Sequence, residues 1–213
     1  TCTVTAESDR KCRKLLRRLA RDGAVAIAAA GCYAEVDPGA LTKLPGVTAL
    51  IPNSRKEGWV KEIMSLLPPA GAAPERQSPG RARAFVKIQD GCERGCSYCI
   101  VPRARGGEVS TPPDVVMEKV MRWRELGSEE VVLCGVNLGR YRHGGGYDLA
   151  SLTRDVLARE EGFRLRLSSI ELEDLNPAWP REWAASQRVC PHLHLPLQSG
   201  DEGVLRDMGR GYG

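Results

Sequence analysis

The sequence has little of what membrane-bound and secreted proteins need. Its apolar runs fall well short of the roughly 20 residues that cross a bilayer, and no secretory signal opens it. We therefore expect a protein that works in the cytoplasm and has no membrane partner. In a reducing compartment, its eight cysteines are expected to bind metals or carry redox chemistry rather than form disulfides.

A fourth metal ligand is also missing where the cysteines are densest. Cys92, Cys96 and Cys99 fall within eight residues at C-x3-C-x2-C spacing, and no further Cys or His lies near them in sequence. A closed structural zinc site takes four N or S ligands. An iron–sulfur cubane held by three thiolates keeps one iron open for a small molecule. The motif therefore favours a [4Fe–4S] cluster over a zinc knuckle or redox thiols.

The net charge of +4 permits a nucleic-acid partner without requiring one. Basic residues gather on one predicted helix, which has Thr5 as its N-cap and ends at Gly23. Its basic face is expected to be solvated, with contact to RNA as the alternative. That face consists of Arg10, Arg13, Lys14, Arg17, Arg18 and Arg21. The opposite, apolar face is expected to pack on the core and consists of Cys12, Leu15, Leu16, Leu19 and Ala20.

Strands and helices alternate in two blocks that a Pro- and Gly-rich stretch separates. In residues 1–67, expected strands at 24–30 and 47–51 and a helix at 55–67 predict a small α/β domain with a parallel sheet. Residues 68–83 are expected to be a linker, because Pro, Gly and small residues do not build a core.

The second block, residues 84–213, repeats the alternation. Four strands are expected, at 84–89, 130–134, 163–170 and 192–195. A capping box at Ser199 predicts a last helix. The cysteine motif follows the first strand, at the end where α/β barrels place their chemistry. We therefore expect an α/β fold in which a partial barrel follows the small domain, in a fragment of a longer protein that lacks both ends.

Several segments resemble the radical S-adenosylmethionine (SAM) methylthiotransferases. They are Thr1-Cys-Thr-Val-Thr5, Ala30-Gly-Cys-Tyr-Ala34, Phe85-Val-Lys-Ile-Gln-Asp-Gly-Cys92, Cys99-Ile-Val-Pro-Arg-Ala-Arg-Gly106, Gly135-Val-Asn-Leu-Gly139, Leu167-Ser-Ser-Ile-Glu171 and His192-Leu-His-Leu-Pro-Leu-Gln-Ser-Gly200. Within the family, the first and last segments look most like the bacterial enzymes that act on threonylcarbamoyladenosine in tRNA.

The resemblance implies a transferase that modifies tRNA. Cys92, Cys96 and Cys99 would hold a [4Fe–4S] cluster whose open iron chelates SAM. An electron from a flavodoxin- or ferredoxin-like donor would cleave SAM to methionine and a radical, which abstracts hydrogen from C2 of N6-threonylcarbamoyladenosine at position 37 of tRNA. The cofactor thus carries the step that acid–base chemistry cannot. A second SAM would supply the methyl group.

A second [4Fe–4S] cluster, which delivers the sulfur, is also implied. It has three cysteine ligands, and Cys2 and Cys32 match the later two; from the residues alone, this pair is weak evidence for a metal. The first ligand is expected upstream of residue 1, and Cys12 does not match its position. A C-terminal RNA-binding domain and the later barrel strands are likewise expected outside the fragment.

Contacts to SAM or substrate are implied at the ends of the barrel strands, with a strand-end hydrogen bond or a cap as the plain alternative for each residue. These residues are Tyr98, Gly135, Asn137, Ser169, Glu171 and Gln198. His192 and His194 are expected either in the core or at the substrate. No catalytic side chain is predicted.

Two alternatives stay open at this point. One is a related methylthiotransferase that acts on N6-isopentenyladenosine in tRNA or on an aspartate of a ribosomal protein, since these enzymes have the same cluster motifs. The other is a non-enzymatic module that binds zinc or RNA. The alternation of strands and helices favours an enzyme barrel over a small zinc module.

Overall fold

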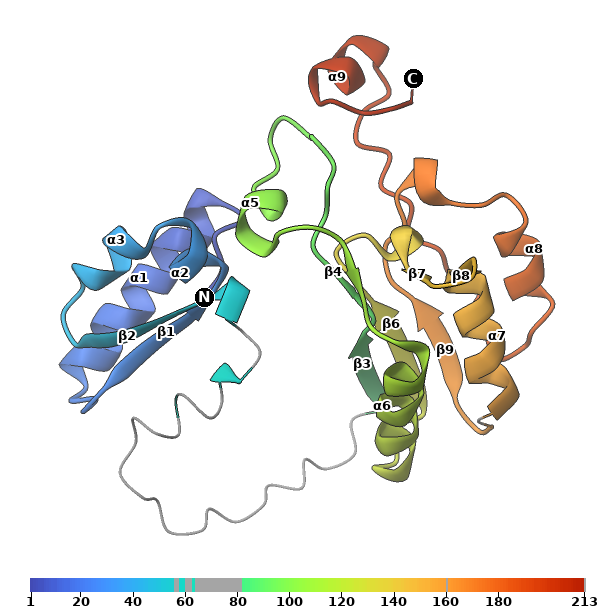
Figure 1. The fold of residues 1–213 in the computed structure, drawn as a ribbon, viewed down its shortest axis with the longest axis horizontal. Coiled ribbons are helices and arrows are strands. Elements are labelled where there is room, and N and C mark those ends of the chain that lie inside the picture. Colours follow the sequence, from blue (N-terminus) through green and yellow to red (C-terminus); the bar gives the residue numbers. More distant parts are fainter. Residues whose placement is uncertain (56–57, 60–62, 64–81, 160, 213) are drawn as a thin grey trace. The chain divides into compact units, whose positions relative to one another are not determined.

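The computed structural model describes residues 1–55, 58–59, 63, 82–159 and 161–212. The chain divides into two compact units, each of which mixes helices with parallel strands as an α/β fold requires (Figure 1). Unit 1 comprises Thr1–Arg76 and Tyr98–Gly106, and unit 2 comprises Gln77–Ser97 and Gly107–Gly213. Most of the helix expected at 55–67 and of the linker expected at 68–83 lies outside the described residues, so the domain boundaries stay a prediction.

The sheet of unit 1 consists of two parallel strands, β1 (Ile27–Gly31) and β2 (Val47–Pro52). The long helix α1 (Ala6–Arg21) begins at the predicted N-cap, where the Thr5 hydroxyl accepts a hydrogen bond from the Ser8 amide at 3.1 Å. Shorter elements complete the unit: α2 (Cys32–Val36), α3 (Pro38–Thr42), η1 (Asn53–Arg55) and α5 (Val101–Arg105).

The prediction of a five-residue apolar face on α1 is only partly right. Leu16 is buried, with Cys12 and Ala20 packed against the same core. In contrast, Leu15 is 56% exposed and Leu19 is 39% exposed. A sheet of two strands contacts one narrow stripe of a helix, so the edge of the apolar arc stays outside that contact.

Unit 2 is built on the three-stranded parallel sheet β3-β6-β9. Its strands are β3 (Arg83–Lys87), β6 (Glu130–Cys134) and β9 (Arg164–Leu167). The helices α6 (Pro113–Glu125) and α7 (Leu149–Arg159) connect them, which gives the strand–helix–strand order of the predicted barrel. The remaining helices are α8 (Trp179–Ala184) and α9 (Glu202–Asp207).

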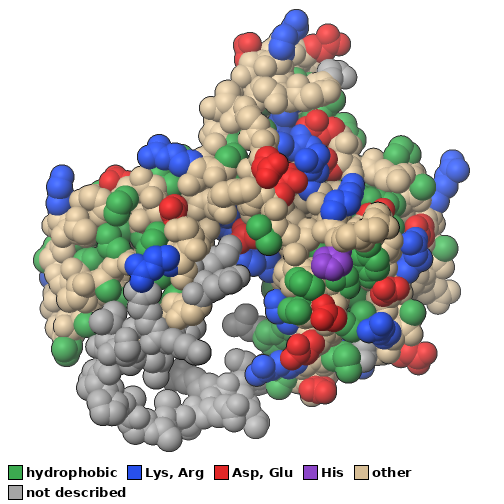
Figure 2. All heavy atoms as spheres, in the orientation of Figure 1, with side chains coloured by type: hydrophobic (Ala, Val, Ile, Leu, Met, Phe, Trp, Pro, Cys, Tyr) green, Lys and Arg blue, Asp and Glu red, His purple; other side chains and the backbone are tan. Residues whose placement is uncertain are grey.

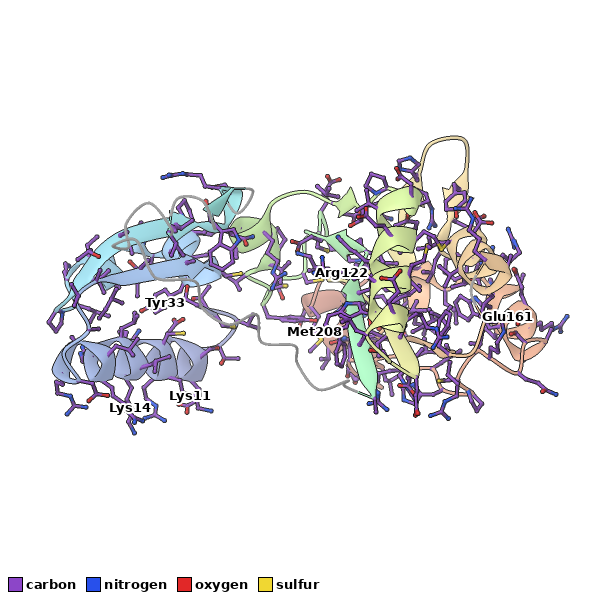
Figure 3. The ribbon with its side chains drawn as sticks, turned by 90° about the horizontal axis from the view of Figure 1, so that it is seen from below. Lys11, Lys14, Tyr33, Arg122, Glu161 and Met208 are labelled. Atoms are coloured by element: carbon purple, nitrogen blue, oxygen red, sulfur yellow. The ribbon has the colours of Figure 1, made fainter. Side chains whose placement is uncertain are left out.

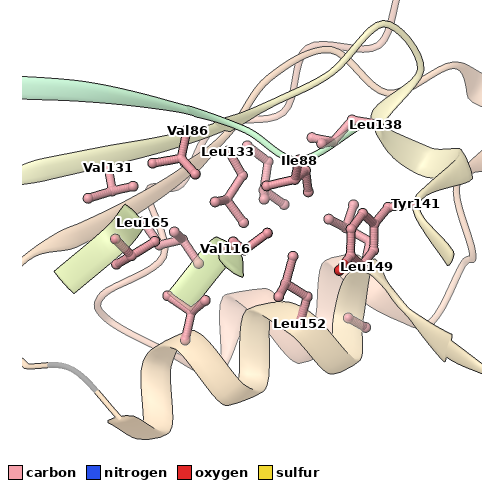
Figure 4. Close-up of a cluster of buried hydrophobic side chains, with 14 of the residues drawn as sticks. Val86, Ile88, Val116, Val131, Leu133, Leu138, Tyr141, Leu149, Leu152 and Leu165 are labelled. Carbon is pink, nitrogen blue, oxygen red and sulfur yellow. The ribbon is translucent and has the colours of Figure 1, made fainter. Parts of the chain in front are cut away.

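The core of unit 2 lies between this sheet and its helices (Figure 4). Val131 and Leu165 of the sheet meet Val116 of α6 and Leu152 of α7, and all four side chains are buried. Along β3 the burial alternates, so that Val86 is buried and Phe85 is 60% exposed. The sheet therefore buries the face that the helices cover and presents a second face with charged side chains.

The second face carries a buried carboxylate. Glu130, at the start of β6, has a side chain only 4% exposed and pairs with arginines of both neighbouring strands. Arg83 Nε and Arg166 Nε each lie 2.6 Å from its Oε1, and Arg164 Nη2 lies 3.3 Å from Oε2. These pairs hold the pKa of Glu130 below its usual value, with the hydrogen bond from Arg166 as the largest cause.

The fourth strand predicted at 192–195 is wrong. The segment lies beside the residues that follow β9, where the Ile170 amide donates to the His194 carbonyl at 3.1 Å, but it forms no strand. Pro191 and Pro196 flank it and have no amide hydrogen to donate to a ladder, which limits regular pairing. Just upstream, Val189 forms a single parallel bridge with Leu165.

The cap predicted at Ser199 is displaced by two residues. Asp201 is the N-cap of α9, and its Oδ1 accepts from the Val204 amide at 2.9 Å. Asp is as good a cap as Ser, so the local sequence offered two starts and the later one is used.

Candidate active site

The first two cysteines of the motif lie on residues 91–97, here called the cysteine loop. The loop follows β3 and the short strand β4 (Gln89–Asp90), which pairs antiparallel with β5 (Val109–Ser110). Cys92 is buried, and its Sγ accepts from the Arg94 amide at 3.5 Å. Burial raises the pKa of the Cys92 thiol. Cys96 is partly exposed.

Arg94 anchors this loop to the segment that follows β9. Its guanidinium pairs with Glu173 and, from Nη2 to Oδ2 at 2.5 Å, with Asp174. Both carboxylates belong to the 3-10 helix η3 (Leu172–Asp174). The Arg94 side chain is 17% exposed and that of Asp174 is 7% exposed, so water screens the pairs little.

Asn137 lies at the centre of the same network. Its amide donates to Gln89 Oε1 at 2.8 Å, and its Nδ2 donates to Asp174 Oδ2 at 2.9 Å. Gln89 Nε2 in turn donates to the carbonyls of Asp90 and Gly91, at 3.0 and 2.9 Å. Within the described part of the chain, the buried Oδ1 of Asn137 has no hydrogen-bond partner. The loop after β6 therefore supports the cysteine loop and keeps one buried acceptor unused.

Gly135 has a packing reason to be glycine. A Cβ at this position would lie 2.9 Å from Gln89 Cβ and 3.0 Å from Gln89 Oε1. Any side chain would therefore displace the amide that holds Asn137. The predicted role of Gly135 in cofactor binding stands beside this structural role.

Residues that follow the later strands make side-chain contacts within unit 2. Ser169 Oγ lies 2.7 Å from Nδ1 of the exposed His194. Glu171 Oε2 accepts from Arg210 Nη1 at 2.9 Å, and the Arg210 side chain is 4% exposed. Gln198 has φ of 65°, a region that non-glycine residues seldom adopt. All of them lie in unit 2, as the cysteine loop does.

The turn after α9 packs on the cysteine loop. The Ser97 amide donates to the Met208 carbonyl at 3.1 Å, and Ser97 Oγ donates to the Asp207 carbonyl at 2.8 Å. A Cβ at Gly209 would lie 3.0 Å from the Gly95 carbonyl oxygen, so the two backbones approach closely. The cysteine loop is thus held by two sets of contacts: Arg94 pairs with η3, and Ser97 donates hydrogen bonds to the end of α9.

The remaining motif residues belong to unit 1. Cys99 is partly exposed and Tyr98 is 55% exposed. They precede α5, which is held within the unit by a hydrogen bond from Asn53 Nδ2 to the Ala104 carbonyl at 3.1 Å.

Unit 1 also brings the segments of Cys2 and Cys32 together. Thr1 Oγ1 donates to the Ala30 carbonyl at 2.8 Å, and a Cβ at Gly31 would lie 2.8 Å from the Thr1 carbonyl oxygen. Thr1 and Gly31 are each followed by a cysteine, exposed Cys2 and buried Cys32. The two segments therefore meet at the C-terminal end of β1.

Comparison with known proteins decides the family. The model of the radical SAM superfamily matches residues 86–213. This chain belongs to the radical SAM superfamily. The whole chain is 35% identical to the threonylcarbamoyladenosine tRNA methylthiotransferase MtaB of Chlamydia pneumoniae, of which it covers 50%. It is 33% identical to MtaB of Thermotoga maritima and 36% identical to the tRNA-2-methylthio-N(6)-dimethylallyladenosine synthase of Anaeromyxobacter dehalogenans.

The alignment covers 52% and 49% of those two relatives, so the chain spans about half the length of the curated relatives it matches. As a radical SAM protein, it is expected to use SAM and a [4Fe–4S] cluster. Thiols are the ligands that such a cluster takes, and all eight cysteines are free. Across the described residues, no three His, Cys, Asp or Glu side chains are grouped so that they would hold a metal ion. The ligand set Cys92, Cys96 and Cys99 is therefore still an inference from spacing. No described helix is long and apolar enough to cross a membrane.

Sequence reasoning missed the side chains that hold the cysteine loop in shape. Arg94, Glu173 and Asp174 are absent from the predicted set, as is Gln89. An arginine between two motif cysteines was a visible signal, because a charge inside a metal loop needs a partner. Nothing in the sequence indicated that the partners lie about 80 positions further on.

Proposed function

We propose that this protein carries the radical SAM part of a tRNA methylthiotransferase that adds a methylthio group to C2 of N6-threonylcarbamoyladenosine at position 37 of tRNA. The observation that carries the proposal is the cysteine loop at the carboxyl edge of a parallel sheet, where barrels keep their active sites. The match of MtaB relatives along the whole chain supports the same substrate.

The proposed ligands of the radical SAM cluster are the thiolates of Cys92, Cys96 and Cys99. When bound, the cluster supplies the electron that cleaves SAM. The protein's part is to fix the loop and to limit water around it. The Arg94 pairs, the Asn137–Asp174 hydrogen bond and the buried position of Cys92 support that part.

SAM itself would be oriented by the residues at the strand ends. Asn137 Oδ1 is the best supported contact, because a buried acceptor without a described partner fits the ammonium group of an amino acid. Gly135 is proposed as a contact because it lies in the same loop as Asn137, and the exposed ring of Tyr98 would pack on the adenine. Ser169, Glu171 and Gln198 are proposed for the ribose or the substrate.

The second [4Fe–4S] cluster is proposed at Cys2 and Cys32, with a third ligand from elsewhere. The meeting of their two segments at the end of β1 supports this pair. We further propose that a flavodoxin- or ferredoxin-like protein in the cytoplasm supplies the electron.

A second candidate substrate is N6-isopentenyladenosine in tRNA. The 36% identity to the Anaeromyxobacter dehalogenans synthase, named for a dimethylallyladenosine product, favours it. Mass spectrometry of nucleosides from tRNA that lacks the methylthio group, incubated with the reconstituted protein, separates the two. Methylthio-threonylcarbamoyladenosine supports the first substrate, and methylthio-isopentenyladenosine supports the second.

The cluster is tested by counting iron and acid-labile sulfide after anaerobic reconstitution. We compare the protein with its Cys92→Ala, Cys96→Ala, Cys99→Ala variant, and expect the variant to lose about four irons per chain. A brown protein that forms 5′-deoxyadenosine from SAM supports the radical reaction. A colourless protein that holds zinc and no iron would support the zinc module instead.

A further inference from the structure

Three basic side chains of α1 form a stripe that the proposed chemistry does not use. Lys14, Arg17 and Arg21, here called the α1 stripe, are exposed and lie at i, i+3 and i+7, so they share one face of the helix. With Pro45 they line a surface hollow of about 350 Å³. Figure 3 shows Lys14 and Lys11 projecting from α1 on the side away from β1 and β2, while Tyr33 lies between the helix and the strands.

The charge on α1 is concentrated and largely of one sign. The helix holds seven basic and two acidic residues, so its net charge of +5 exceeds the +4 of the whole chain. Two acids are already paired at its two ends. Glu7 pairs with Arg10 and Lys11, and Asp22 pairs with Arg18. Among the described residues, the α1 stripe makes no salt bridge.

Such a stripe is unfavourable for an isolated helix, because like charges three and four residues apart repel each other. The surface of unit 2 that Figure 2 shows has no comparable face of basic side chains among the described residues. Its basic and acidic side chains lie side by side over much of the surface (Figure 2), and the hollow beside α6 alternates Glu118 and Glu125 with Arg122 and Arg159. The unbalanced positive charge of the α1 stripe therefore favours binding to a polyanion over exposure to solvent alone.

We propose that the α1 stripe binds the phosphate backbone of RNA. Lys14 and Arg21 are separated by about 10 Å along the helix, at 1.5 Å per residue, so the stripe can meet successive phosphates. Arginine binds phosphate with two parallel N–H donors, and the stripe has two arginines. The proposal rests on the proposed function only for the identity of the RNA, which would be the tRNA substrate.

An anionic membrane fits the stripe less well. The exposed apolar residues Leu15 and Leu19 would have to enter such a surface. The helical period puts them roughly opposite the α1 stripe, so no flat surface engages both groups. An RNA backbone needs the basic side chains alone.

The test is the salt dependence of tRNA binding by the full protein. We compare Lys14→Glu/Arg17→Glu/Arg21→Glu with the control Lys119→Glu/Arg122→Glu/Arg159→Glu, which changes the net charge equally on the mixed-charge face. Each lost phosphate contact lowers the slope of log K against log salt by about 0.7–0.9. We expect the stripe variant to lose about 2–3 in slope and the control to lose less than about one.

Equal slopes in the two variants would overturn the proposal, as would wild-type binding to phosphatidylserine vesicles that competes with tRNA. If charge reversal prevents folding, the Lys14→Gln/Arg17→Gln/Arg21→Gln variant gives the same comparison. Formation of 5′-deoxyadenosine from SAM without RNA should be unchanged in the stripe variant. If the wild type binds tRNA through the stripe but methylthiolates none, the proposed function fails and the RNA surface stands.

Discussion

Arg94 and Asp174 lie 80 residues apart in the sequence and are joined by a hydrogen bond of 2.5 Å between Nη2 and Oδ2. The same carboxylate oxygen accepts from Asn137 Nδ2 at 2.9 Å. One side chain of η3 therefore connects the cysteine loop with the loop after β6. A loop ordered in this way before any ligand binds costs less conformational entropy when a cluster or SAM arrives.

We predict that Arg94→Ala lowers the free energy of unfolding by about 3 kcal/mol, since it removes the arginine that pairs with Glu173 and leaves the poorly hydrated Asp174 with only Asn137 and the more distant Arg140. Urea denaturation measures the loss. The same variant should take up less iron during anaerobic reconstitution. Arg181→Ala is the control, because Arg181 is exposed, and it should cost less than about 0.5 kcal/mol. If the free energy of unfolding falls equally in the two variants, the Arg94 ion pairs do not stabilise the fold.

Gly135→Ala is predicted to destabilise the same network by about 1–3 kcal/mol, because the new methyl group would lie 2.9 Å from Gln89 Cβ. Displacement of Gln89 also breaks its hydrogen bond to the Asn137 amide. Thermal unfolding compares this variant with Gly144→Ala, where a methyl group meets nothing within 4 Å. A transition temperature for Gly135→Ala no lower than that of Gly144→Ala would contradict the packing argument.

The sequence was informative where the signal is local. Hydrophobic runs predicted β3, β6 and β9 and their parallel order, and the cap at Thr5 predicted where α1 begins. The spacing of three cysteines and the segments shared with a known family led to the radical SAM superfamily, which the match over residues 86–213 establishes.

Predictions from local sequence were wrong where the outcome depends on how several helices and strands pack together. The exposure of Leu15 and Leu19 depends on the width of the sheet beneath α1, which periodicity does not contain. The segment 192–195 has a strand-like pattern, but its flanking prolines weaken the ladder that would make it a strand. The pairing of Arg94 with η3 is a contact between distant positions, and no single-sequence rule predicts such contacts.

Glu130 offers a prediction about acid stability. Its folded-state pKa is lowered, chiefly by the hydrogen bond from Arg166, so its contribution is present above the unfolded pKa of about 4.3 and is lost as the pH falls through the folded value. We expect Glu130→Gln to cost about 2–4 kcal/mol at pH 7 and progressively less below about pH 4. Denaturation at several pH values measures this, with the exposed Glu118→Gln as control. A cost that stays constant with pH would show that packing, not charge, sets the effect.

Tyr141 gives the corresponding prediction in alkali. The side chain is fully buried, its hydroxyl donates to the Thr111 carbonyl at 2.8 Å, and burial raises its pKa to about 12. Unfolded tyrosine has a pKa of about 10, so the neutral phenol contributes its full stability below pH 10 and loses it as the pH rises towards 12. Two pKa units correspond to about 3 kcal/mol of free energy of unfolding.

In Tyr141→Phe this decline should be absent. The free energy of unfolding of the variant is about 1 kcal/mol lower at pH 8, because the Thr111 carbonyl loses its donor. The measurement is the free energy of unfolding from pH 8 to pH 11.5 in both proteins. Parallel curves would mean that the buried phenol does not couple folding to pH.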